Sequence, residues 1–145
     1  MFPLHWAFGR ITGGLRSRHR RHAGFHECRR GGSGRLPVKR GDLVTVALQD
    51  NYSKTRPALV IQSDQFPGTA SVVVLPVTST LMDAPLLRLT VEPDAGNHLR
   101  ATSQIMLDKP MTVKADKIGP AFGSLDDVAM VSVSRSLALF LGLAG

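Results

Sequence analysis

Short apolar segments separated by turn residues occupy most of the chain after residue 38. Segments 43–48 and 56–62 are rich in β-branched and aliphatic residues, and the segment between them, 49–53, is polar. Segment 70–77 is apolar on both faces, as expected for a central strand that is buried on each side. This spacing predicts successive antiparallel strands rather than a parallel sheet.

The strand pattern continues toward the carboxyl end. Residues 86–92 alternate in part between apolar and polar positions, and a turn rich in Pro, Asp, Gly and Asn follows at 93–97. Residues 103–108 and 112–114 supply two further β-rich segments. Five or six short strands in a row favour a small, strongly curved antiparallel sheet or barrel.

The last segment has helical rather than alternating spacing. Apolar residues recur every three to five positions there: Leu125, Val128, Ala129, Val133, Leu137 and Phe140. Ser124 is a suitable N-cap, and Asp126 and Asp127 would lie in the first turn, where the helix dipole favours negative charge. Because such stripes usually cover a core, we expect a C-terminal helix packed on the sheet, and therefore a mainly β fold with helices (α+β).

Charge divides the chain at about residue 37. Residues 1–37 contain eight Arg, no Lys and one acid, Glu27, for a net charge of +7, whereas residues 38–145 contain ten basic and ten acidic residues. Glycine and histidine are also concentrated in residues 1–37, without any helical or alternating apolar period. We therefore expect a disordered basic arm at 1–37 and one folded domain at 38–145.

Three explanations of this arm are open. Arginine without lysine, mixed with glycine and histidine, is what translated DNA upstream of the true start would give, with Val38 or Leu36 as the alternative start. A genuine Arg-rich arm would add sequence-independent affinity for nucleic-acid phosphates. A targeting peptide is the third explanation, although the first residues lack the leading positive charges of a secretory signal.

Composition also indicates the cellular setting. No apolar run approaches the length needed to span a membrane. The single cysteine, Cys28, cannot form an internal disulfide, and the scattered histidines do not make a metal site. We expect a cytoplasmic protein with no cofactor, no metal and no membrane partner.

Polar side chains stand at the ends of two apolar strands. Arg56 lies at the start of one strand beside a proline, and Thr78 and Ser79 end another strand just after a second proline. Proline lacks an N–H and fits strand starts, edges and bulges, where backbone is exposed. A guanidinium presents a permanently charged planar fork to phosphate oxygens, and hydroxyls can donate to the same group. Taken alone, Arg56 is better explained as a surface residue paired with Asp50 or Asp64.

These positions belong to a longer set of motifs. Arg40-Gly41-Asp42, Thr55-Arg56-Pro57-Ala58, Pro76-Val77-Thr78-Ser79 and Ser103-Gln104 occur in this order within residues 38–142. Their order and spacing resemble those of the MazF/PemK family of toxin endoribonucleases. The resemblance implies a small curved sheet or SH3-like barrel of the CcdB/MazF type with a C-terminal helix. It also implies a metal-independent enzyme that cuts single-stranded RNA, forms a homodimer and is held inactive by a small acidic antitoxin.

The same resemblance implies the roles of individual residues. Arg56 and Thr78 are the catalytic candidates, with Ser79 and Asp108 in support. Metal-independent RNA cleavage needs charge stabilisation on the phosphorane, which the guanidinium of Arg56 suits. Because residues 38–145 carry no net charge, RNA binding must rely on a local basic groove. The basic residues expected to form it are Lys54, Arg56, Arg88 and Lys109.

Two departures from the family pattern bear on the mechanism. Some members carry an arginine directly after the pair matched by Gln104-Ile105, where it is assigned acid or base work, but this chain has Met106. His98 is the only histidine after residue 37, and an imidazole could act as a base, although a solvated turn histidine is the simpler explanation.

A second function class stays open. The fold includes CcdB-type toxins that poison DNA gyrase without catalysis, and small curved sheets often only bind nucleic acid or protein. Those poisons carry a tryptophan near the carboxyl end, whereas this chain ends Phe140-Leu141-Gly142-Leu143-Ala144-Gly145. The combination of Arg56 and Thr78 favours cleavage.

Overall fold

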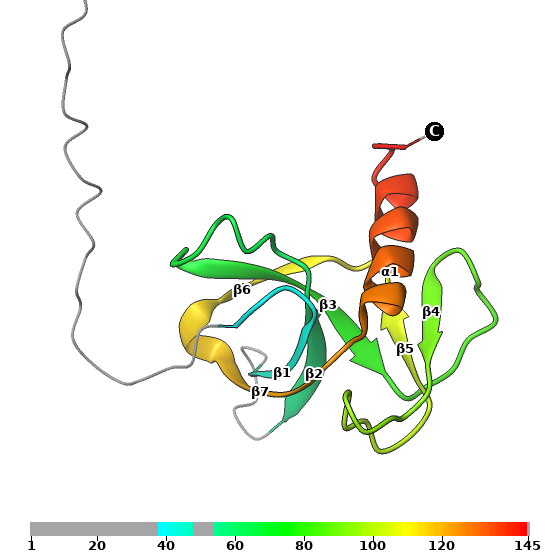
Figure 1. Cartoon of the computed structure of the whole chain (residues 1–145), viewed down its shortest axis with the longest axis horizontal. Helices are drawn as coiled ribbons and strands as arrows, with labels where there is room; N and C mark the ends of the chain where they lie inside the picture. The colour runs from blue at the N-terminus through cyan, green and yellow to red at the C-terminus, as the bar shows by residue number, and fades with distance from the viewer. Residues whose placement is uncertain (1–37, 48–53, 145) are drawn as a thin grey trace, which may run out of the picture. The chain divides into compact units, whose positions relative to one another are not determined.

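A computed structural model describes residues 38–47 and 54–144 of the chain. The predicted arm at 1–37 and the predicted loop at 49–53 lie outside the described residues. The described part contains seven strands, one α-helix and one short 3-10 helix (Figure 1). They are β1 (Asp42–Ala47), β2 (Thr55–Val60), β3 (Ser71–Thr78), β4 (Arg88–Val91), β5 (Ser103–Met106), β6 (Met111–Lys114), η1 (Ala115–Lys117), β7 (Ile118–Ser124) and α1 (Asp127–Phe140).

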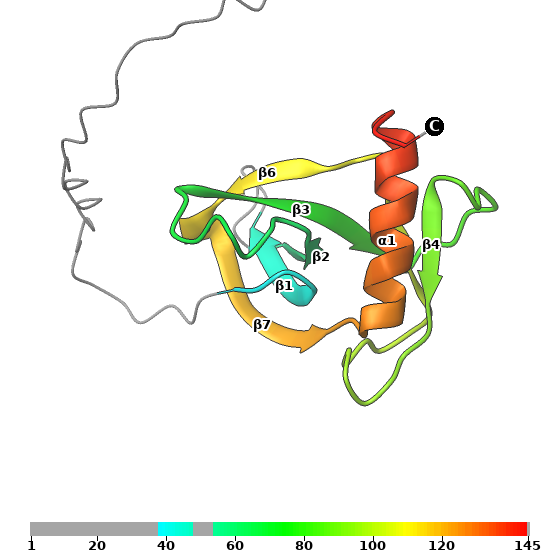
Figure 2. The same ribbon diagram turned by 45° about the horizontal axis from the view of Figure 1, so that its top comes forward.

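The strands form one curved sheet in which every pairing is antiparallel. Their order is β4-β5-β3-β2-β1-β7, with β6 also paired to β3. Figures 1 and 2 show the sheet wrapping around β1, with β3 and β6 on one side and β7 on the other. Within the described strands β6 and β7 do not pair with each other, so the sheet stays open. The predicted curved antiparallel sheet with a C-terminal helix is confirmed.

The segment predicted as a central strand, β3, organises the sheet. One edge of β3 pairs with β2, and the other edge pairs first with β6, over residues 71–74, and then with β5, at Val77 and Thr78. Its apolar residues are buried on both faces, as the sequence predicted. The far end of β3 therefore lies where one edge passes from β6 to β5.

Two apolar clusters hold the two faces of the sheet. The first includes Leu43, Leu59, Leu75, Val77 and Ile105, together with Val133 of α1. The second lies on the alternate positions of the same strands and includes Val44, Val46, Ala58, Val60, Val74 and Ile118. Burial of this kind stabilises the fold by about 25 cal/mol for each Å² of apolar surface removed from water. Only the first cluster is covered by α1.

The start of α1 differs from the prediction. The Asp126 carboxylate accepts a hydrogen bond from the Ala129 N–H at 2.7 Å, which makes Asp126 the N-cap. The predicted cap, Ser124, is instead the last residue of β7, and its N–H donates to the Gly96 carbonyl at 3.1 Å. Ser124 cannot cap the helix because its own backbone is still in the sheet.

The apolar stripe of α1 is also narrower than predicted. Val133 is fully buried, and Ala129 and Leu137 pack against the first cluster. Val128 and Phe140, which the spacing assigned to the same stripe, are exposed. The prediction that the helix covers the sheet is confirmed, but by a smaller set of side chains.

The sequence pattern did not predict β7. Gly119, Pro120 and Gly123 interrupt its apolar positions, and its pairing with β1 contains register shifts. A Cβ atom at residue 119 would lie 2.4 Å from Thr45 Oγ1, and one at residue 123 would lie 2.3 Å from the Asn97 carbonyl oxygen. Glycine is therefore required at residue 123, where a Cβ would meet backbone atoms, and a Cβ at residue 119 would force the Thr45 side chain to move.

The motif Arg40-Gly41-Asp42 has a structural use. The Arg40 guanidinium donates to the Ile61 carbonyl and, at 2.8 Å, to Ser134 Oγ on α1. Gly41 has φ of +94°, which favours glycine. The Arg40 N–H donates to Asp64 Oδ1 at 2.8 Å, so this carboxylate supports the turn before β1. The motif fastens the start of the sheet to β2 and α1.

A separate observation concerns membranes. Among the described residues, no helix combines the length and the apolar character required to cross a bilayer.

Candidate active site

Three polar side chains, from β3, β5 and β4, lie on the sheet face opposite α1. Val77 and Ile105 are cross-strand partners within the cluster that α1 covers. Because side chains alternate along a strand, the next pair, Thr78 and Gln104, points to the opposite face. Gln104 is also the cross-strand partner of Thr90 on β4. Thr78, Gln104 and Thr90 thus form a polar row across β3, β5 and β4.

Arg56 lies on β2, two residues before Ala58 and on the same face of the strand. The ladder between β2 and β3 ends at the pair Ala58 and Pro76, and Arg56 and Thr78 each lie two residues beyond that pair. On its other edge β2 stays paired with β1 as far as Thr55, so only the edge that faces β3 is unpaired at Arg56. The Arg56 side chain is exposed, and no residue in the ranges 38–47 and 54–144 pairs with it. Asp50, one of the two carboxylates considered as its partner, lies outside the described residues.

The Thr78 hydroxyl oxygen takes part in one local hydrogen bond. It accepts a hydrogen bond from the Thr80 N–H at 3.1 Å, a local turn that Thr commonly makes. This bond uses an acceptor lone pair and leaves the hydroxyl hydrogen free to donate. Ser79 is exposed, and its hydroxyl has no hydrogen bond within the described ranges. Thr78 is therefore the better-oriented donor of the two.

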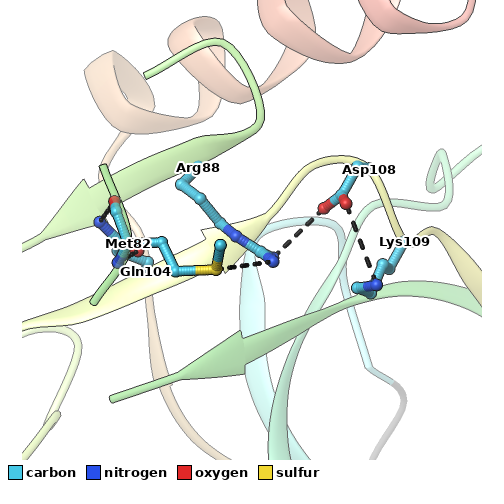
Figure 3. A network of polar contacts seen from close by, with 5 residues as sticks. All are labelled: Met82, Arg88, Gln104, Asp108 and Lys109. Carbon is cyan, nitrogen blue, oxygen red and sulfur yellow. Dashed lines mark hydrogen bonds and ion pairs between the residues drawn. The ribbon is translucent and has the colours of Figure 1, made fainter. Parts of the chain in front are cut away.

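Gln104 holds the segment that follows Thr78. Its Oε1 accepts from the Met82 N–H at 2.9 Å, and its Nε2 donates to the Met82 carbonyl at 3.0 Å (Figure 3). Nε2 also lies 3.3 Å from Thr90 Oγ1. The residue is 6% exposed. Sequence reasoning included Gln104 in a motif but missed this use; the available signal was an amide side chain within a short strand, directly before Ile105 and Met106.

An ion pair lies next to the Met82 side chain (Figure 3). Arg88 Nη1 is 3.2 Å from Asp108 Oδ1, with side-chain exposures of 8% and 21%. Both atoms are buried, and neither has an aligned hydrogen bond in the described part of the chain. Arg88 Nη2 contacts Met82 Sδ at 3.7 Å, and Arg88 is the cross-strand partner of Met106.

The predicted RNA-binding residues therefore fall into two groups. Lys54 is exposed, and Lys109 is 55% exposed, with its Nζ 4.0 Å from Asp108 Oδ2. The Arg88 guanidinium is enclosed with Asp108 instead. Asp108 contacts both basic side chains, so its supporting role in this structure is to neutralise Arg88 and to lie beside Lys109.

Exposure varies along the polar row: Thr90 is exposed, Thr78 is half-buried and Gln104 is buried. A hollow of about 1080 Å³ has Thr55, Phe66 and Ile118 among its lining residues, but not Thr78 or Gln104. His98 is exposed in a turn with φ of +53°. Within the residues that the structure describes, no group of three or more His, Cys, Asp or Glu side chains could hold a metal ion.

Comparison with known proteins identifies the family. A model of PemK-like, MazF-like toxins of type II toxin-antitoxin systems matches residues 39–141. The chain belongs to this family. A probable endoribonuclease MazF of Mycolicibacterium smegmatis is 43% identical over 109 residues, which are 74% of this chain and 100% of that protein.

Solved structures of MazF toxins share the fold. An endoribonuclease in complex with its cognate antitoxin, from a mycobacterial species, superposes with a TM-score of 0.62 at 22% identity, over 74% of this chain and 98% of that one. A MazE-MazF complex of Deinococcus radiodurans superposes with a TM-score of 0.62 at 20% identity, over 76% of this chain and 100% of that one. The curved sheet with its C-terminal helix is thus the MazF fold.

Proposed function

We propose that this MazF-family toxin is an endoribonuclease that cuts single-stranded RNA without a metal ion. The proposal is supported by the positions of Arg56 and Thr78, which each lie two residues beyond the last pair of the β2–β3 ladder, on the face opposite α1. The 43% identity to a probable endoribonuclease, across that protein's whole length, supports the same activity.

In the proposed reaction the ribose 2′-oxygen attacks the adjacent phosphorus, and the bond from phosphorus to the 5′-oxygen breaks. The 2′-hydroxyl loses a proton and the departing 5′-oxygen gains one, so the products carry a 2′,3′-cyclic phosphate and a 5′-hydroxyl. Negative charge builds on the non-bridging oxygens, where preorganised donors are most effective. Arg56 would donate two parallel N–H groups to them, and Thr78 would donate its hydroxyl hydrogen.

The shape and charge of this face fit single-stranded RNA. An open surface can accept bases that are splayed out of a strand, whereas a duplex would present mainly its backbone. Lys54 and Lys109 are exposed and would bind phosphates on either side of the scissile bond. Arg88 would contribute to the electrostatic field, although its guanidinium is paired with Asp108.

We also propose the partners that the family suggests. The toxin would act in the cytoplasm as a homodimer and be held inactive by an acidic antitoxin. A mycobacterial relative and the Deinococcus radiodurans relative were each solved with an antitoxin. The exposed Arg56 and lysines offer such a partner a basic surface at the site itself.

The activity can be tested on a defined single-stranded RNA in EDTA. We expect cleavage that persists in the chelator and yields 2′,3′-cyclic phosphate and 5′-hydroxyl ends. Activity that requires added metal, or ends with a 3′-hydroxyl, would contradict the mechanism. Intact RNA together with gyrase inhibition would instead support the non-catalytic alternative.

Replacing Arg56 separates the site from the rest of the molecule. Arg56→Ala should abolish cleavage and toxicity while leaving the melting temperature unchanged, because the side chain is exposed at a strand end. Arg56→Lys should restore little, since a lysine cannot make the two parallel hydrogen bonds. Arg135→Ala is the matched control, because Arg135 is an exposed arginine on α1. An active Arg56→Ala protein would remove Arg56 from the mechanism.

A further inference from the structure

We propose that Gln104 is a positioning residue for Thr78 and acts by fixing the loop of residues 79–87 between β3 and β4. The inference rests on the proposed function, because it concerns the orientation of the hydroxyl assigned to the RNA phosphate. It assigns Gln104 no contact with substrate.

The two hydrogen bonds between the Gln104 amide and Met82 can form in only one orientation of the amide. The Oε1 atom can only accept, and the Nε2 atom can only donate. They face the N–H and the carbonyl of the same residue, at 2.9 and 3.0 Å. If the amide were rotated by half a turn, its Nε2 donor would face the Met82 N–H donor and its Oε1 acceptor would face the Met82 carbonyl acceptor. Gln104 therefore fixes Met82 in position and in orientation.

The base of this clamp is rigid. Gln104 lies on β5, between β3 and β4, with Thr78 and Thr90 as cross-strand partners. It is buried, and its side chain has the further contact with Thr90 Oγ1. A buried amide that lost its partners would leave unsatisfied polar atoms, at a cost comparable to that of a lost hydrogen bond.

The two ends of the loop are held differently. At its far end the Leu107 N–H donates to the Leu87 carbonyl at 3.0 Å, and the N–H groups of Leu87 and Arg88 donate to the Ala84 carbonyl. At its near end the Thr80 N–H donates to Thr78 Oγ1, the Gln104 clamp holds both backbone groups of Met82, and the Met82 carbonyl also accepts from the Ala84 N–H at 3.1 Å within the loop. The Gln104 clamp therefore supplies the hydrogen bonds that tie the backbone of this half of the loop to β5.

This arrangement connects Gln104 to the hydroxyl. Met82 lies two residues after Thr80, whose N–H occupies the acceptor side of Thr78 Oγ1. If Met82 is released, Thr80 is free to leave that oxygen, and the hydroxyl can rotate away from the direction in which it would donate. Loss of alignment, even by about 1 Å, can lower a rate on the order of 10²-fold.

The chain supplies a matched control for this test. Gln62 clamps the loop between β2 and β3 in a similar way, since its Nε2 donates to the Phe66 carbonyl at 3.0 Å and its Oε1 accepts from the Val73 N–H at 3.2 Å. Gln62 therefore tests the effect of losing a loop clamp as such. Methionine has nearly the same length as glutamine but forms neither hydrogen bond.

The experiment compares Gln104→Met with Gln62→Met in the full chain. We expect Gln104→Met to lower kcat by about 10²-fold, to leave the dissociation constant for a 2′-deoxy analogue of the RNA nearly unchanged, and to speed hydrogen exchange at the Met82 amide. Gln62→Met should keep the wild-type kcat. Gln104→Glu, which retains the acceptor for the Met82 N–H, should fall between wild type and Gln104→Met and serves if the methionine variant does not fold.

Equal kcat values for the two folded methionine variants would overturn the proposal. So would a loss of kcat in Gln104→Met with slow exchange retained at Met82, because the loop would then not carry the effect. An inactive wild-type protein would instead show that the proposed function itself fails. Exchange at Met82 does not depend on RNA cleavage and separates these two failures.

Discussion

At the scale of single residues, the hydroxyl of Thr78 gives the most direct test of the site. Thr78→Val keeps the shape of the side chain and removes the only group it can donate. If that group stabilises charge in the transition state, kcat should fall on the order of 10²-fold. Single-turnover kinetics on a defined RNA would measure the chemical step.

The control for this change is Thr78→Ser, which keeps the hydroxyl and the bond from the Thr80 N–H. It should retain most of the activity. Wild-type kinetics for Thr78→Val would instead assign the hydroxyl to the local turn alone.

Single residues also show how far the sequence could predict the site. Arg56 and Thr78 could be selected because a charge and a hydroxyl beside proline at strand ends are unusual and match a family. Their position relative to each other could not be predicted from the sequence, because it depends on the register between β2 and β3. The role of Gln104 depends on a backbone contact across 22 residues, which no spacing rule contains. The roles of Arg56, Thr78, Ser79 and Asp108 remain predictions.

At the scale of elements, the hairpin of β4 and β5 carries a buried charge pair. Asp108→Asn would leave the Arg88 guanidinium without its counter-charge at 8% exposure. Breaking a buried pair from one side is destabilising, here by about 3 kcal/mol. We expect kcat to fall less than in Thr78→Val, because Asp108 is not placed to donate to the phosphate. Urea unfolding monitored by circular dichroism would give the stability.

The second half of this test also removes the Arg88 guanidinium, which has lost its counter-charge. Adding Arg88→Met to Asp108→Asn should recover most of the lost stability, since replacing both members of a buried pair is often nearly neutral. If the double variant is less stable than Asp108→Asn, the pair is not the source of the effect.

The secondary-structure elements also differ in how well the sequence pattern predicts them. The segments that form β1 to β3 have long apolar runs that match their burial, so the pattern predicted them. β7 is a strand because its backbone fits beside Thr45 and Asn97, where glycine replaces the apolar side chains that a pattern search needs. The misplaced cap at Ser124 follows from the same omission, because a strand through residue 124 delays the helix.

At the scale of the whole molecule, the first 37 residues hold the net positive charge, and removing them tests whether they bind RNA. A chain that starts at Val38 should keep the melting temperature and cleavage rate of the full chain, because residues 1–37 lack an apolar face that could offset the entropy of ordering them. Its RNA affinity should depend on salt with the same slope, measured by titration at several salt concentrations.

A shallower slope for the shorter chain would contradict this expectation. It would mean that some of the eight arginines contact phosphates, because each contact adds to the slope of log K against log salt. The arm would then be a nucleic-acid tether.

The pairing of β7 with β1 has a consequence for the synthesis of the protein. The two strands are separated by most of the folded sequence, and β1 keeps one edge unpaired until β7 is available. An unpaired edge is a template for association with other chains. A nascent or prematurely ended polypeptide that stops before Ile118 would expose this edge even if it already contained Arg56, Thr78 and Gln104. Incomplete chains of this toxin should therefore tend to aggregate.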